Sequence, residues 1–179
     1  MCRFITLIVP SAEADAVRGM MEQHGRTAAP LDNPSVRRVL REGERQYLTT
    51  RRHCDCGTVL AQRYDSAQAA EEKIARDIHR WKRKGWSDAK IARAIEDQRR
   101  ADARPSGGDV DSIELWNAIL ADLGKALHLP YAGLFLRFYS SAISTEVFDA
   151  TRREIRKDMS RLEALGSMRH DEVTIFPLA

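Results

Sequence analysis

The chain has 179 residues, of which 43% are hydrophobic and 31% are charged, and its formal net charge is +3. This composition is typical of a water-soluble domain that buries its own core without the help of disulfides. No apolar run approaches the length of a bilayer span, and so small a net charge does not by itself indicate a nucleic-acid partner. The opening apolar run lacks the cleavage pattern of a secretory signal, and three cysteines cannot all pair, so we expect reduced thiols, no membrane association and a cytoplasmic protein.

The first third of the chain predicts strands that alternate with helices. Residues 1–10 form a nearly continuous apolar run, which is typical of a strand covered on both faces. A helical pattern follows from Ser11 to His24, where a glycine stops it. A loop over 27–34, a short helical piece over 36–40 and a strand over 46–51 complete this part.

Residues 66–101 predict two helices joined at Gly85. The phrase from Gly85 to Ile95 resembles the first helix of helix-turn-helix DNA-binding domains. The position of a recognition helix is taken by residues 99–108, whose composition is typical of a connection. We therefore predict a helical hairpin over 66–101, as an insertion or flank, and a flexible connection over 102–110.

The last part of the chain predicts a helix, a strand, a second helix and a final strand. Asp111 is a candidate cap for the first helix, which is strongly amphipathic. Alternating apolar residues make 132–139 the clearest strand, and a helix over 145–165 and a strand over 172–176 follow. We expect a single α+β domain over 1–179, with a mixed sheet of about four strands packed with helices.

The stretch around Cys54 and Cys56 is the most chemically distinctive part of the chain, because it also holds His53 and Gly57. If the chain is extended here, the two sulfurs lie roughly 7 Å apart, too far for a disulfide. Three interpretations stay open. The cysteines are small buried side chains in a sheet; or they turn around Gly57 to bind zinc; or one of them is a reactive thiolate. In the zinc interpretation, Cys2 supplies a third thiolate and His53 the fourth ligand.

A basic and aromatic cluster ends the first predicted helix of the hairpin. It consists of Arg80, Trp81, Lys82, Arg83, Lys84 and Trp86. Cations beside aromatic rings can hold a phosphate backbone and stack a base, which would make the hairpin a surface for an acidic macromolecule, either nucleic acid or protein. Equally, cations in a last helical turn complement the helix dipole, and the tryptophans can close the hairpin against a core.

Arg137 lies in the clearest predicted strand, and Ser140 and Ser141 follow it. A strand-to-helix turn with hydroxyl groups and a nearby cation is a place where an anion can bind. We therefore retain these three residues as a hypothetical anion site. The alternative is that Arg137 lies on an exposed face and the hydroxyl groups cap the next helix.

The residues Met1-Cys2-Arg3-Phe4 resemble the start of class II glutamine amidotransferases, in which removal of the methionine frees an N-terminal cysteine that is both nucleophile and base. The resemblance covers these four residues, and we find no counterpart of that family's Asn-Gly-containing segment. It implies, as an alternative, a thiol-dependent hydrolase or amidotransferase-like enzyme that uses Cys2 or Cys54. We favour a non-enzymatic binding or accessory protein whose cofactor is zinc or none.

Overall fold

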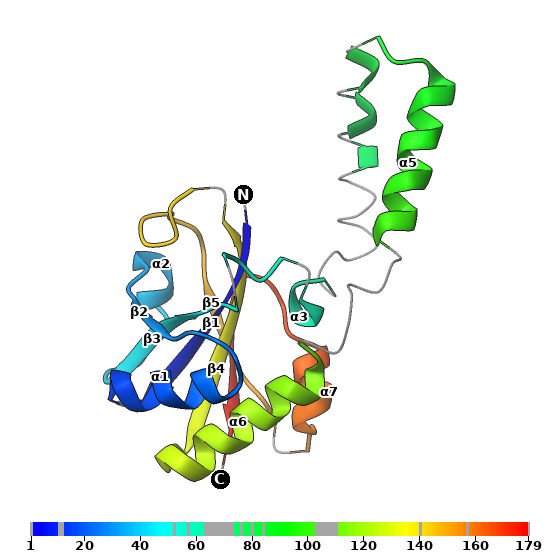
Figure 1. Cartoon of the computed structure of the whole chain (residues 1–179). Coiled ribbons are helices and arrows are strands. Elements are labelled where there is room, and N and C mark those ends of the chain that lie inside the picture. The colour runs from blue at the N-terminus through cyan, green and yellow to red at the C-terminus, as the bar shows by residue number, and fades with distance from the viewer. Residues whose placement is uncertain are drawn as a thin grey trace. The chain divides into compact units, whose positions relative to one another are not determined.

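The computed structural model of the chain describes residues 2–10, 13–51, 53–56, 58–62, 74–75, 77–79, 81–83, 85–102, 111–139, 141–156 and 158–178. Its contacts divide the chain into two compact units (Figure 1). One unit consists of Met1–Gln62 together with Asp111–Ala179, and the other of Arg63–Val110. The sheet and all three cysteines belong to the first unit.

The first unit is built on a six-stranded mixed sheet in the order β2-β3-β1-β4-β6-β5. Its strands are β1 (Cys2–Pro10), β2 (Ala29–Leu31), β3 (Glu44–Thr49), β4 (Tyr131–Tyr139), β5 (Thr151–Glu154) and β6 (Glu172–Pro177). Neighbouring strands are antiparallel except β5 and β6, which are parallel. The α+β class is confirmed, and the prediction of about four strands is wrong.

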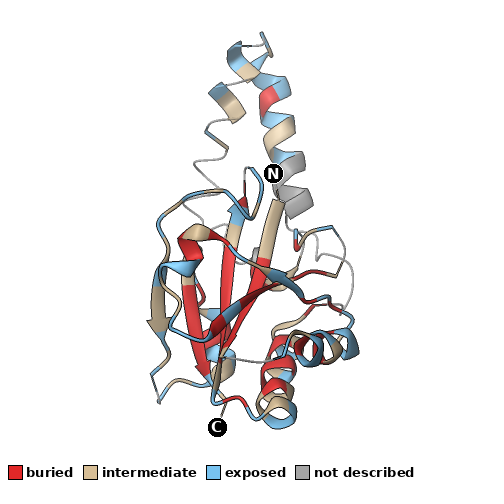
Figure 2. Cartoon of the chain, turned by 90° about the vertical axis from the view of Figure 1, so that its left-hand side faces the viewer, coloured by how far each residue is buried: buried red, intermediate tan, exposed pale blue. Residues whose placement is uncertain are grey.

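Three helices, α1 (Ala14–Gln23), α6 (Ile113–Leu127) and α7 (Arg161–Gly166), lie together on one face of this sheet (Figures 1 and 2). Each buries an apolar stripe, and the stripe of α6 consists of Trp116, Ile119, Leu120 and Leu123. The short helix α2 (Pro34–Arg37) buries Val36 in a second cluster with Ile8 and Phe135. Figure 2 shows how burial is concentrated in the central strands.

The predicted helix over 145–165 is wrong in its first half. Residues 146–150 are irregular, β5 follows, and only Arg161–Gly166 is helical. Phe148, in this irregular segment, places its ring centre 5.8 Å from that of Phe135 and 5.9 Å from that of Tyr139. This packing against the sheet outweighs the weak helical periodicity of the segment.

The beginning of α6 also differs from the prediction. Its cap is Ser112, whose hydroxyl accepts the N–H of Leu115 at 3.1 Å. Asp111, the predicted cap, is buried and pairs with Arg26 instead. Asp111, one position before the cap, therefore serves an ion pair rather than the helix end.

In the second unit, residues 74–75, 77–79 and 81–83 are helical, and α5 (Asp88–Asp102) follows. The turn between them contains Gly85, whose φ of 72° favours glycine, and its N–H donates to the carbonyl of Lys82 at 3.0 Å. The hairpin stays a prediction, since 66–73 and three later positions lie outside the described residues. The predicted connection over 102–110 begins inside α5, whose last residue is Asp102, and 103–110 lie outside the described residues.

Within the described part of the chain, no helix has both the length and the apolar character that crossing a bilayer requires.

Candidate metal centre

Three sulfur atoms meet at one end of the sheet. The Sγ atoms of Cys2, Cys54 and Cys56 all lie within 4.8 Å of one another. Cys2 is the first residue of β1, and the other two lie in the loop after β3. Because β1 and β3 are antiparallel, with Ile5 opposite Thr49, the chain that leaves β3 runs back along the beginning of β1. The strand order thus brings together cysteines that are distant in sequence.

Backbone hydrogen bonds tie this loop to β1. The N–H of Asp55 donates to the carbonyl of Arg3 at 2.9 Å, and the N–H of Ile5 donates to the Asp55 carboxylate at 2.8 Å. The N–H of Arg3 donates to the sulfur of Cys56 at 3.2 Å. Hydrogen bonds of this kind orient metal ligands and stabilise charge on them. The N–H of Arg3 therefore helps to fix the position of the Cys56 sulfur.

The loop turns at the cysteines, so the separation of roughly 7 Å expected for an extended chain does not apply. The hydroxyl and the N–H of Thr58 donate to the carbonyl of Asp55 at 2.9 Å and 3.1 Å, which closes a tight turn after Cys56. The zinc interpretation places its turn at Gly57, which lies outside the described residues. The sulfurs of Cys54 and Cys56 lie within 4.8 Å of one another, closer than an extended chain would bring them.

The exposure of the three cysteines bears on one of the three interpretations of the sequence. Cys2 and Cys54 are half-buried and Cys56 is exposed, so the interpretation as buried structural side chains is wrong. His53 is exposed and does not belong to the group of converging ligand atoms, which in the described part of the chain contains the three cysteines. Three soft ligands at this spacing are compatible with zinc.

A buried ion cluster lies directly behind the loop. The guanidinium of Arg26, whose side chain is completely buried, contacts the carboxylate of Asp55 and donates to Asp111 at 3.1 Å and to the carbonyl of Thr49 at 2.8 Å. Its central carbon also lies 4.4 Å from the centre of the Trp116 ring. The sequence analysis missed Arg26, because nothing in its local sequence distinguishes it from an exposed arginine.

Burial sets the electrostatics of this cluster. It raises the pKa of Asp55 to about 6, while the charge of Arg26 and the N–H of Ile5 oppose the rise. Burial likewise raises the pKa of Asp111, and Arg26 again opposes it. At neutral pH Asp55 is therefore still ionised, and its ion pair with Arg26 is formed.

The hypothetical anion site at Arg137 contains an internal carboxylate. Arg137 donates to Glu146 at 2.7 Å and to Asp171 at 2.6 Å. The N–H and hydroxyl of Ser141 donate to the same Glu146 at 2.7 Å and 2.9 Å. Glu146 thus occupies the position that the sequence analysis gave to an external anion. Ser140 lies outside the described residues.

Four residues of the basic and aromatic cluster are described. The rings of Trp81 and Trp86 stack on one another with centres 5.3 Å apart and planes at 4°, and Lys90 lies 4.2 Å from the Trp86 ring centre. Lys82 and Arg83 are exposed, whereas Arg80 and Lys84 lie outside the described residues. The tryptophans therefore contact each other, and the described cations of the cluster face solvent.

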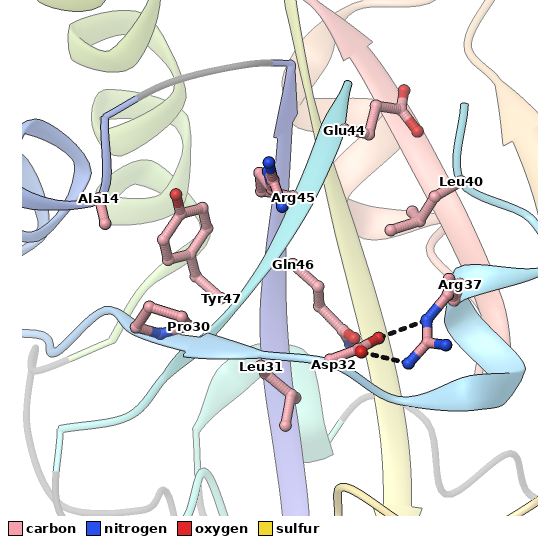
Figure 3. A pocket seen from close by; sticks show the side chains of 10 residues that line it. All are labelled: Ala14, Pro30, Leu31, Asp32, Arg37, Leu40, Glu44, Arg45, Gln46 and Tyr47. Carbon is pink, nitrogen blue, oxygen red and sulfur yellow. Dashed lines mark hydrogen bonds and ion pairs between the residues drawn. The ribbon is translucent and has the colours of Figure 1, made fainter. Parts of the chain in front are cut away.

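A pocket of about 550 Å³ lies near the β2 edge of the sheet (Figure 3). Side chains from α1, β2, α2 and β3 line it, among them Pro30, Asp32, Arg37 and Tyr47. Arg37 donates to Asp32 through Nε at 2.6 Å, as Figure 3 shows. The mixed signs of its lining and this internal pairing favour no class of ligand.

The chain matches no protein-family model, and comparisons with curated proteins and with solved structures give no significant match. The function is therefore argued from the site itself.

Proposed function

We propose that the protein binds a thiophilic divalent metal ion, zinc in the first place, and acts as a non-enzymatic accessory or binding protein. The observation that carries this proposal is the convergence of the sulfurs of Cys2, Cys54 and Cys56 within 4.8 Å. Thiolates select soft ions such as zinc over magnesium or calcium. Zinc would draw its first three ligands from this group.

Two further contacts support a metal site over a chance encounter of thiols. The N–H of Arg3 donates to the Cys56 sulfur at 3.2 Å and so holds this ligand in place. The buried carboxylate of Asp55 fixes the residue between two of the cysteines. Ligands held in place before the metal arrives lose less conformational entropy when they bind it.

The metal content of the purified protein tests the proposal, by elemental mass spectrometry together with a count of free thiols in denaturant. We expect about one zinc ion per chain. Cys2→Ser, Cys54→Ser and Cys56→Ser should each lose it, because each removes one thiolate. His53→Ala is the matched variant in the same loop, and loss of zinc from it would identify the fourth ligand. A wild-type protein that carries no metal and does not bind added zinc would contradict the proposal.

We further propose that the second unit captures an acidic macromolecule. The support is the exposure of Lys82 and Arg83 beside the stacked tryptophans. Binding to nucleic acid or to an acidic protein through these cations should weaken as salt rises. Replacement of Lys82, Arg83 and Lys84 by glutamine should abolish salt-sensitive capture, whereas Lys125→Gln on the exposed side of α6 should not. Unchanged capture by the triple variant would exclude this surface.

The alternative is a thiol-dependent enzyme that uses Cys2 or Cys54. Such an enzyme needs a thiol that reacts quickly with an electrophile near neutral pH, even when no metal is present. Iodoacetamide should therefore modify one thiol of the metal-free protein much faster than a model peptide thiol. Equal and slow modification of all three thiols would favour the metal-binding proposal.

A further inference from the structure

Arg26 is a large charged side chain that the fold buries completely. Gly25, with a φ of 67°, turns the chain at the end of α1, and the N–H of Arg26 then donates back to the carbonyl of Met21 at 3.0 Å. This turn directs the guanidinium into the first unit beneath the cysteine loop. A buried cation requires compensation by charge and hydrogen bonds, and here every partner comes from a different segment.

The partners of Arg26 hold it in one orientation. One terminal nitrogen donates to Asp111, just before α6, and the other contacts Asp55 and the carbonyl of Thr49 at the end of β3. The ring of Trp116 covers the guanidinium face. An arginine fixed on its edge and on its face has little freedom to move, so it can act as a rigid support.

The support acts on the metal ligands through Asp55. This residue lies between Cys54 and Cys56, and its carboxylate is shared between Arg26 and the N–H of Ile5. Its own backbone is bonded to Arg3, whose N–H in turn donates to the Cys56 sulfur. A shift of Asp55 would therefore displace both flanking cysteines and the hydrogen bond to one of them.

We propose that Arg26 is the positioning residue of the cysteine site: by holding Asp55 from behind, it sets the affinity and the ligand geometry of the bound metal. This inference rests on the proposed metal-binding function. Arg26 touches no sulfur and acts entirely through Asp55. Groups that orient metal ligands in this way change metal affinity by about 10–100-fold when they are removed.

Cobalt is the probe that tests the proposal, because thiolate ligation of Co²⁺ produces visible and near-ultraviolet absorption that reports ligand number and geometry. The reduced, metal-free protein is titrated with Co²⁺ and then with Zn²⁺, and the two affinities are compared among variants. Arg26→Gln should bind both ions about 10–100-fold more weakly and should show an altered cobalt spectrum. Arg26→Lys retains the cation but not the fork of donors, so it should recover part of the affinity.

Arg152→Gln is the matched control. Arg152 is also largely buried in the first unit and donates to Glu44 at 2.8 Å and 2.9 Å, and it has no hydrogen bond or ion pair with the described residues of the cysteine loop. The Arg152→Gln variant should lose stability, while its cobalt spectrum and its affinities for Co²⁺ and Zn²⁺ stay unchanged. If Arg26→Gln fails to fold, Asp111→Asn loosens Arg26 and leaves Asp55 intact, and it should still weaken binding about 10-fold.

Equal affinities and spectra in wild-type protein, Arg26→Gln and Asp111→Asn would overturn the inference while leaving the metal site in place. The same spectral change in Arg152→Gln would also overturn it, because the effect would then follow from general destabilisation. Failure of the wild-type protein to bind either ion would instead contradict the proposed function, and so the two failures are distinguishable.

Discussion

The carboxylate of Asp55 accepts the backbone N–H of Ile5 at 2.8 Å, in the position where a neighbouring strand would offer a carbonyl. The hydroxyl of Thr49 donates to the carbonyl of the same Ile5 at 2.8 Å. Side chains thus take over the hydrogen bonds of β1 where β3 ends. The position of the cysteine loop consequently depends on individual side chains, and single substitutions can test it.

Replacement of Asp55 by alanine should destabilise the metal-free protein by about 3–5 kcal/mol, because it leaves Arg26 buried beside a single carboxylate and removes the acceptor for Ile5. Asp55→Asn retains a similar shape and one acceptor, so its loss should be smaller. Urea unfolding at pH 7 of reduced, metal-free protein measures both. A loss below about 1 kcal/mol for Asp55→Ala would contradict this account of the buried cluster.

The lowered pKa of Glu44 predicts that the first unit loses stability in acid. Burial raises the pKa of Glu44. Hydrogen bonds from Arg152, Arg41 and Tyr131 together lower it by more than burial raises it, so the pKa lies below the ordinary 4.5. At pH values between the lowered pKa and 4.5, the unfolded chain binds more protons than the folded one. The stabilisation is therefore fully present above pH 4.5 and is lost as the pH falls through the lowered pKa.

The variant Glu44→Gln isolates this contribution, because it cannot ionise and keeps one acceptor oxygen for Arg152. Its free energy of unfolding in urea should lie below that of the wild-type protein at pH 7, and the difference should shrink as the pH falls through the lowered pKa of the wild-type carboxylate. A difference that stays constant across this range would show that ionised Glu44 contributes nothing beyond its shape.

Two helical glycines should respond to alanine in opposite directions. A Cβ atom at Gly19 in α1 meets nothing within 4 Å, so Gly19→Ala should stabilise the protein by about 0.5–1 kcal/mol through helix propensity. At Gly124 in α6 the same atom would lie 2.9 Å from the Cβ of Leu178 and 3.2 Å from its carbonyl oxygen. Gly124→Ala should therefore destabilise it by about 1–3 kcal/mol. Thermal or urea unfolding measures the change in stability of both variants. Two changes of the same sign would contradict this account of the packing around the two glycines.

Asn33 joins two parts of the first unit. Its Oδ1 accepts the N–H groups of Ser35 and Val36, which caps α2, and its amide donates to the carbonyls of Ile143 and Glu146 at 2.6 Å and 3.0 Å. Asn33→Ala should cost about 2–3 kcal/mol, since it removes a cap and also removes the amide that donates to two half-buried carbonyls.

The comparison for Asn33→Ala is Ser112→Ala, which removes the hydroxyl that caps α6. That variant should lose about 1 kcal/mol. Equal losses in chemical denaturation would mean that the bonds to the 143–146 segment add nothing to the stability.

Strong apolar patterns were sufficient to predict β1, β4, β6 and α6, because each of these elements buries one or both faces. The short edge strands β2 and β5 were missed. The sequence of β5 is Thr-Arg-Arg-Glu and carries no apolar signal, and its arginines pair with Glu44 and Glu172. Edge strands that are held by backbone pairing and ion pairs cannot be recognised from a pattern of hydrophobic residues.

The three cysteines could be proposed as a group from their residue type, but not placed together, because that required the pairing of β1 with β3. The buried cluster of Arg26, Asp55 and Asp111 could not be predicted from the sequence. Arg26 lies after a helix stop and Asp111 before a helix, positions where both residue types are usually exposed. A buried ion pair depends on long-range contacts that no local pattern records.

The adjacency of Cys2 and Cys54 also gives a bound metal a mechanical role. An ion that joins them closes a loop containing β1, α1, β2, α2 and β3. In the chain-entropy description of cross-links, closure of a loop of this size removes about 4 kcal/mol of disorder from the denatured chain. A bound ion would then act as a removable cross-link, and the free energy of unfolding of the protein would rise with the concentration of metal available to it.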